Sequence, residues 1–243
     1  MKQLHPALLA SQALLPKDAP VHLLTRHSIR EQPDNQFADG SVPLTDEGRE
    51  LAYAWGQHIE RPFGALYTSP IGRCVETAEY MLAGSTEAKT STLILPPEKT
   101  TVLVEPGCFV TDINLAGPHF FRLGARGFIN TYLSDRVPGV LTPAAGLSKL
   151  ATYLYHHHGS KDTVAVHVTH DTILAAFVSA LLGKQHIQPS DWPWMLEGLW
   201  CWFSPRGLHW IWRGEQGVTP LEFHPDGSHL VVHSSLLLNG SSA

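Results

Sequence analysis

The stretch Val21–Arg30, which reads VHLLTRHSIR, decides the fold that we predict for this chain. Its first half is apolar and typical of a buried β-strand, whereas its second half places Arg26, His27 and Arg30 where that strand ends. A helix should follow, because Thr45 is a suitable N-cap and apolar residues recur every four positions behind it. We therefore interpret the stretch as a strand-to-helix transition with charged side chains at its turn.

A second transition of this kind lies further along the chain. Residues 65–68 are an expected short strand, and Ser69 is a candidate N-cap for a helix that reaches about Leu82. This helix would hold Arg73 in its first turn. A charged residue thus again lies in the transition from a strand to a helix.

The third transition completes the pattern. The β-branched run 163–168 is followed by His170 and Asp171, and then by an apolar helix over 172–182 that Gly183 ends. Strands that alternate with helices predict an α/β fold. We expect a three-layer sandwich with a mostly parallel central sheet and helices on both faces.

Two stretches interrupt this alternation. Residues 84–143 are punctuated by Gly and Pro and hold one strand candidate, 101–104, so we expect a cap that shapes the substrate pocket. Residues 199–203 and 208–213 flank a Ser-Pro-Arg-Gly turn and predict a hairpin rich in tryptophan. We predict a single domain over 1–243.

Composition narrows the class of protein. The 243 residues carry a net charge of -5 with 43% hydrophobic content, which suits a globular domain. The chain has no run of Lys or Arg for nucleic acid and no apolar run of about 20 residues for a membrane. Its 3 cysteines are widely spaced, so we expect neither a disulfide framework nor a thiolate zinc site. We expect a cytoplasmic protein with no nucleic-acid or membrane partner, and the oligomeric state stays open.

The charged residues after the three strands indicate phosphate chemistry. Ligands of open α/β sheets bind beyond the carboxyl ends of the strands, where these residues would meet. Guanidinium groups match phosphate oxygens, and a neutral imidazole can attack phosphorus. The expected partner is therefore a small-molecule phosphate ester, and the leaving group would need a proton from an acid.

Four motifs in the same order resemble those of the histidine phosphatase (phosphoglycerate mutase-like) superfamily. They are TRHSIR at 25–30, LTDEGR at 44–49, YTSPIGRCVETA at 67–78 and VTHD at 168–171. Ser28 stands where the superfamily usually has Gly. The resemblance covers about 20–82 and 144–183, and it implies the histidine phosphatase fold with a cap insertion at 84–143.

The resemblance also implies roles for individual residues. His27 would become phosphorylated, and the phosphate would be bound by Arg26, Arg30, Arg73 and His170. The proton donor has two candidates. Asp171 is our preferred candidate, as in the acid phosphatase branch, while Glu105 occupies a place comparable to the donor of the mutase-like branch.

These inferences predict a phosphomonoesterase that acts on a small phosphorylated metabolite through phosphohistidine, without metal or cofactor. A phosphomutase would share the chemistry, and a non-catalytic module would share only phosphate binding. A metal-dependent His-Asp phosphohydrolase would instead use His170 and Asp171 as ligands on helices, which the strand-like run before them disfavours. The chain has 15 histidines, but consecutive ones at His156–His158 cannot converge on one ion from a helix. We assign no metal site to the sequence.

Overall fold

The strand predicted from the opening stretch forms the middle of a seven-stranded sheet. The computed structural model describes residues 4, 6–32, 40–91, 93, 96–134 and 136–232. The sheet order is β3-β2-β4-β1-β5-β6-β7. Its strands are β1 (Val21–Arg26), β2 (Phe63–Thr68), β3 (Glu98–Lys99), β4 (Val164–Thr169), β5 (Gly198–Ser204), β6 (Gly207–Trp212) and β7 (Glu215–Thr219).

The sheet has a parallel half and an antiparallel half. β1, β2, β3 and β4 run parallel, whereas β5, β6 and β7 join them as antiparallel neighbours. The predicted tryptophan-rich hairpin is confirmed as β5 and β6, where Trp200 faces Ile211 in the register. A separate two-stranded sheet contains β8 (Glu222–Phe223) and β9 (Leu230–Val231). The mostly parallel core is therefore as expected, with an antiparallel extension.

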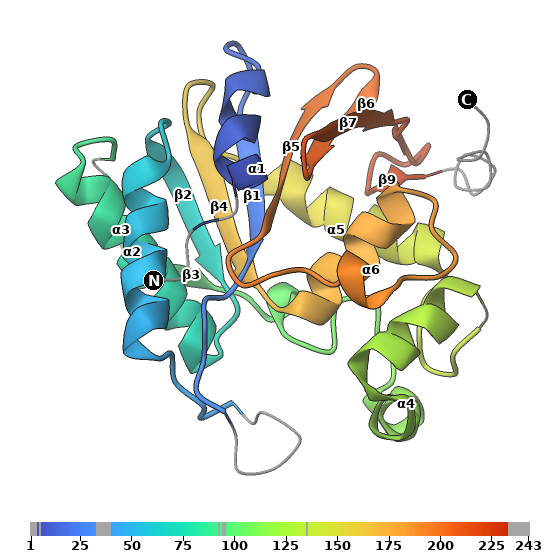
Figure 1. Ribbon diagram of the computed structural model, residues 1–243. Helices are drawn as coiled ribbons and strands as arrows, with labels where there is room; N and C mark the ends of the chain where they lie inside the picture. The colour runs from blue at the N-terminus through green and yellow to red at the C-terminus, as the bar shows by residue number, and fades with distance from the viewer. Residues whose placement is uncertain are drawn as a thin grey trace.

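Helices cover both faces of the sheet, so the predicted three-layer arrangement is confirmed (Figure 1). Residues of α1, α2 and α3 form one core cluster with the sheet, and residues of α4, α5 and α6 form the other. The helices are α1 (Pro6–Ala10), α2 (Asp46–His58), α3 (Gly72–Glu87), α4 (Ile113–Ser134), α5 (Pro143–His156) and α6 (Asp171–Leu181), with short 3₁₀ helices η1 (Ser11–Leu14), η2 (Thr101–Leu103) and η3 (Pro189–Asp191). None of the described helices is both long and apolar enough to cross a membrane.

Local sequence signals explain where α2 begins and why it packs closely. Thr45 is its N-cap, as predicted, and its side chain accepts a hydrogen bond from the backbone of Gly48. A Cβ atom on Gly48 would lie 2.1 Å from the backbone oxygen of Ile29. Only glycine fits this contact, which brings the start of α2 against the segment that carries Arg30.

Two local expectations are wrong. Residues 101–104 are not a strand, because the Thr100 side chain accepts a hydrogen bond from the backbone of Val102 and the chain turns into η2. The helix after β2 begins at Gly72 with Ile71 as its N-cap rather than Ser69. The Ser69 hydroxyl instead accepts a hydrogen bond from the backbone N–H of Ile71, and its oxygen lies 3.0 Å from His170 Nε2.

Residues 84–143 contain the end of α3, β3, η2 and the long helix α4. α4 is interrupted at Gly124, whose φ of 67° and ψ of 168° lie outside the helical region. Pro118 also lies inside this helix. That this stretch acts as a cap within a single domain over 1–243 stays a prediction.

Buried histidines form part of the core between the sheet and α5. His22 Nδ1 lies 3.2 Å from His167 Nε2, and the Tyr153 hydroxyl lies 3.3 Å from His167 Nδ1. Burial lowers the pKa of His22 to about 3 and lowers that of His167 well below its usual range. His167 is completely buried, so it is a packed core residue rather than a ligand at the surface.

Candidate active site

The carboxyl ends of β1, β2 and β4 meet at one edge of the sheet and open into a cavity of about 700 Å³. The structure brings six of the seven predicted residues into its lining: His27, Arg30, Arg73, Glu105, His170 and Asp171. Arg26 is not part of the described lining, although it directly precedes His27. The predicted convergence of the three transitions is thus present.

His27 is held in one tautomer at the end of β1. Its Nδ1 lies 2.7 Å from the backbone oxygen of Ser28, which can only accept, so Nδ1 carries the hydrogen and Nε2 has the lone pair. Burial lowers the pKa of His27 well below its usual range, and the positive charge of Arg26 adds to this effect. His27 is therefore a neutral imidazole with Nε2 as the available nucleophilic atom.

Arg73 connects the two predicted catalytic histidines. Its Nε donates to His27 Nε2 at 3.2 Å, and its Nη2 lies 3.2 Å from His170 Nδ1. The two imidazole rings are 5.7 Å apart between centroids and inclined at 72°. One guanidinium group in the first turn of α3 thus contacts both rings.

His170 is fully buried at the N-cap of α6. Because Arg73 can only donate, His170 Nδ1 accepts and Nε2 carries the hydrogen, which faces the Ser69 hydroxyl at 3.0 Å. Burial and then the charge of Arg73 lower the pKa of His170 to about 3. His170 is accordingly neutral in this arrangement.

Ser28 and Thr77, which have no predicted role, hold the segment after β1 in place. The Ser28 hydroxyl donates to the backbone oxygen of Gly48 at 2.6 Å, and its backbone N–H donates to the Thr77 hydroxyl at 3.0 Å. Ser28 therefore ties His27 to α2 and α3 at the position where the superfamily usually has Gly. Thr77 belongs to the matched motif, which is the signal that identifies it.

Arg26 and Asp171 form a partly buried ion pair at 2.6 Å between Arg26 Nη2 and Asp171 Oδ2. Arg26 Nη1 also donates to the backbone oxygen of Pro193 at 2.6 Å, and Trp192 Nε1 donates to Asp171 Oδ2 at 3.3 Å. Arg26 Nε is buried and has no hydrogen-bond partner among the described residues. The contacts of Trp192 and Pro193, just before β5, were missed because no local motif marks them.

Glu105 faces the same cavity from the segment after η2. Its Oε1 accepts from the Thr172 hydroxyl at 3.0 Å, and its Oε2 lies 3.8 Å from Arg73 and 3.9 Å from His170 Nδ1. Burial and the negative charge of Asp171 raise the pKa of Glu105 above its usual range. Glu105 is therefore more easily protonated than an exposed glutamate, a property that suits a proton donor.

The charge balance of the cavity suits an anion. Arg30, Arg73 and Arg122 face two carboxyl groups in its lining, and both histidines are neutral. Burial and the neighbouring charges of Arg73 and Arg26 lower the pKa of Arg30. A dianionic group that enters would relieve this crowding of positive charge.

A second cavity, of about 830 Å³, is separate from this chemistry. It is lined by residues of α5, the end of α6 and β9 and contains none of the predicted site residues. His229 lies at this second cavity and belongs to a group of three side chains with His224 and Asp226. The larger cavity therefore does not mark the predicted active site.

Comparison with known proteins supports the motif analysis. Residues 22–93 match the model of the histidine phosphatase superfamily (branch 1). This segment holds His27, Arg30 and Arg73 but ends before His170. No curated protein sequence matches the chain.

Solved structures share the fold. YhfR of Bacillus stearothermophilus is 17% identical with a TM-score of 0.52, over 80% of this chain and 96% of that one. A mycobacterial glucosyl-3-phosphoglycerate phosphatase, in complex with VO3, is 18% identical with a TM-score of 0.50, over 81% and 100%. The fold of the chain is that of the histidine phosphatases. The resemblance to this superfamily inferred from the four motifs is thereby confirmed.

Proposed function

We propose that the protein is a phosphomonoesterase that works through a phosphohistidine intermediate. The observation that carries this proposal is the neutral imidazole of His27 in the lining of a cation-rich cavity, with the lone pair on Nε2, which accepts a hydrogen bond from Arg73. Arg30, Arg73 and His170 bind the phosphoryl group in this proposal, and the expected substrate is a small phosphorylated metabolite. No step calls for a metal or a cofactor.

In the first step, His27 Nε2 attacks phosphorus and the bond between phosphorus and the ester oxygen breaks. Arg73 turns from the imidazole to the phosphoryl oxygens, where its charge stabilises the transition state. The leaving alkoxide takes a proton from a carboxyl group. The enzyme then carries the phosphoryl group on Nε2 of His27.

We assign the proton to Glu105 rather than to Asp171, which the sequence analysis preferred. Asp171 Oδ2 is already engaged by the Arg26 guanidinium at 2.6 Å and by the Trp192 indole at 3.3 Å. Glu105 has a raised pKa and lies beside Arg73 and His170. In this proposal Asp171 is a positioning residue that holds Arg26 and raises the pKa of Glu105.

In the second step, water attacks the phosphorus of phosphohistidine. The Glu105 carboxylate left by the first step takes a proton from this water, the bond to His27 Nε2 breaks, and inorganic phosphate leaves. The site returns to its starting protonation state. A phosphomutase would differ only in that a second hydroxyl group replaces the water.

Rapid-quench labelling tests the proposal. With a ³²P-labelled aryl phosphate, we expect an acid-labile, base-stable label on the protein and its loss in His27→Ala, together with turnover. His156→Ala removes an exposed histidine and should keep both. Label or turnover retained by His27→Ala would contradict the nucleophile assignment.

The same experiment separates the two alternatives. Transfer of the label to an added alcohol in preference to water would identify a mutase. A wild-type protein that binds phosphate but never acquires the label would be a binding module.

A further inference from the structure

The wall of the active-site cavity that α4 supplies is almost entirely apolar. Ten residues of α4 line the described cavity, and Arg122 is the only one of them with a polar side chain. Five large apolar side chains dominate this wall: Ile113, Phe120, Phe121, Leu123 and Phe128. The cavity thus has one end that is rich in charge, around Arg30 and Arg73, and one apolar end at α4.

Two of these side chains are largely exposed. Ile113 is 54% exposed and Phe121 is 65% exposed. Large apolar side chains that line a cavity and remain accessible gain most when an apolar ligand covers them. A ligand rich in hydroxyl groups would instead give up water here and find few side-chain partners among the described residues.

We infer that the substrate is a phosphate monoester whose leaving group is an apolar alcohol or phenol. For the phosphoryl end of the substrate, this inference rests on the proposed function. For the organic end, it rests on the composition of α4. The phosphoryl group lies against His27 and Arg73, and the organic part packs against Phe121 and Ile113. Polyhydroxylated sugar phosphates and glycerate phosphates are disfavoured on this wall.

Kinetics with two alkyl esters test the inference, because their leaving groups differ in surface but little in chemistry. We expect kcat/KM for hexyl phosphate to exceed that for glycerol 1-phosphate by at least about tenfold. Phe121→Ala should remove most of this difference, because it should raise KM for hexyl phosphate by a much larger factor than KM for glycerol 1-phosphate. Equal kcat/KM for the two esters would overturn the inference while the proposed function stood.

Leu115 supplies the matched control on the same helix. It is 52% exposed but is not part of the described cavity lining. Leu115→Ala should therefore leave both kcat/KM values unchanged. An equal effect of Leu115→Ala and Phe121→Ala would show a general effect on α4 and would overturn the assignment of Phe121.

Binding of non-hydrolysable phosphonates keeps the test independent of turnover. We expect hexylphosphonate to bind at least about tenfold more tightly than methylphosphonate by calorimetry, and Phe121→Ala to reduce that ratio. If neither ester is hydrolysed but the binding ratio holds, the proposed function fails and the inference about the ligand stands. Equal binding of the two phosphonates would overturn it.

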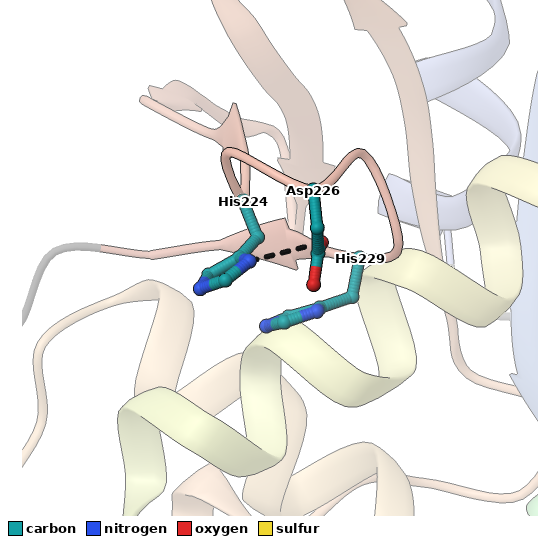
Figure 2. A group of neighbouring side chains, drawn as sticks. All are labelled: His224, Asp226 and His229. Atoms are coloured by element: carbon teal, nitrogen blue, oxygen red, sulfur yellow. Dashed lines mark ion pairs between the residues drawn. The ribbon is translucent and has the colours of Figure 1, made fainter.

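A different observation carries a second inference, in the turn between β8 and β9. This turn reads HPDGSH from His224 to His229, and the ligand atoms of His224, Asp226 and His229 all lie within 4.8 Å of one another. Figure 2 shows the two imidazole rings and the carboxylate gathered beside the turn. The rings are stacked at 4.7 Å with an angle of 16°.

Hydrogen bonds hold these groups near one another. His224 Nδ1 lies 2.9 Å from Asp226 Oδ1, which also accepts from the Ser228 hydroxyl at 2.5 Å. The backbone of His224 pairs with the oxygen of His229 at 2.8 Å, and this contact closes the turn. Two imidazole nitrogens and one carboxylate oxygen thus lie within 4.8 Å of one another, close enough to be ligands of one ion.

We propose that His224, Asp226 and His229 form a surface site for Zn²⁺. Two imidazoles and a carboxylate suit this ion, and three protein ligands leave a fourth position of its tetrahedral geometry for water. The site lies outside the active-site cavity and has no part in the proposed phosphoryl transfer.

Metal titration of the full chain tests this site. Calorimetry with Zn²⁺ should lose one bound equivalent in the double variant His224→Gln, His229→Gln. Co²⁺ should give a visible absorption band typical of tetrahedral coordination in the wild type and not in that variant. The control His156→Gln, His158→Gln removes two other exposed histidines and should keep both signals. Unchanged stoichiometry in the turn variant, or an octahedral Co²⁺ spectrum in the wild type, would overturn the proposal.

Discussion

At the scale of single residues, the motifs predicted which side chains gather at the candidate active site but not the contacts that hold them there. His27, Arg73 and His170 follow from local sequence patterns, because each lies in a predicted transition from a strand to a helix. The roles of Ser28 and Trp192 depend on hydrogen bonds to distant segments, at Gly48 and Asp171. Such pairings arise only when the chain folds, so spacing in the sequence does not show them.

Replacing the carboxyl group of Glu105 by an amide should have a different effect on the kinetics from the same replacement at Asp171. Glu105→Gln removes the proposed proton donor, and we expect kcat for alkyl phosphates to fall by about 10² to 10⁴-fold. Aryl phosphates should lose much less, because their leaving groups need less protonation. Steady-state kinetics on one alkyl and one aryl ester measure this difference.

Asp171→Asn supplies the comparison, because it should affect both classes of ester to a similar degree. The proton on Glu105 also predicts a pH effect: kcat/KM for alkyl esters should fall as pH rises through its raised pKa. Glu105→Gln should lack this alkaline limb. A selective loss on alkyl esters in Asp171→Asn, with none in Glu105→Gln, would return the donor role to Asp171.

At the scale of elements, the predictions held where one local signal dominates. Strands β1, β2 and β4 are marked by short apolar runs, and Thr45 caps α2 as expected. The start of α3 was misplaced because Ser69 uses its hydroxyl in the site rather than at a helix end. The apolar wall of α4 depends on how a helix interrupted at Gly124 packs beside α6, which no local pattern specifies.

The contact between α2 and the segment before it predicts a costly substitution. Gly48→Ala would put a Cβ atom 2.1 Å from the Ile29 backbone oxygen, so the backbone must move. We expect the free energy of unfolding to fall by roughly 1 to 3 kcal/mol. Because Arg30 follows Ile29 directly, it would move with the backbone, and kcat/KM should fall as well. Urea denaturation and steady-state kinetics measure both effects.

Gly117 provides an opposite case in the helix α4. A Cβ atom there would meet no other atom within 4 Å. Gly117→Ala should therefore raise the free energy of unfolding by about 0.5 to 1 kcal/mol, because alanine restricts the unfolded chain. If Gly48→Ala and Gly117→Ala lowered the free energy of unfolding equally, the close approach of Gly48 to Ile29 would not be the cause of the effect.

At the scale of the whole molecule, four buried neutral histidines couple folding to pH. The pKa values of His22 and His170 are lowered to about 3, and those of His27 and His167 also lie well below the usual range. Above about pH 6.5 these groups are neutral in both the folded and the unfolded chain, so they add no pH dependence. Below it the unfolded chain takes up protons that the folded chain does not.

The free energy of unfolding should therefore fall as the pH is lowered from 7 to 5. Each of these histidines contributes about 1.4 kcal/mol per pH unit over the lower part of this window. Urea denaturation at several pH values measures the slope. His22→Leu should reduce it by the share of one histidine, whereas His156→Gln, at an exposed position, should not change it. A stability that is flat across this window would contradict the burial of these rings as neutral groups.

The arginines that crowd the active-site cavity have a practical consequence for every assay of this protein. A pocket with more positive than negative groups takes up small oxyanions by mass action, whatever the physiological ligand is. Phosphate or sulfate in the buffer should thus raise the melting temperature and compete with substrate. The protein purified in phosphate buffer should therefore show a higher melting temperature and a lower activity than the same protein in an amine buffer.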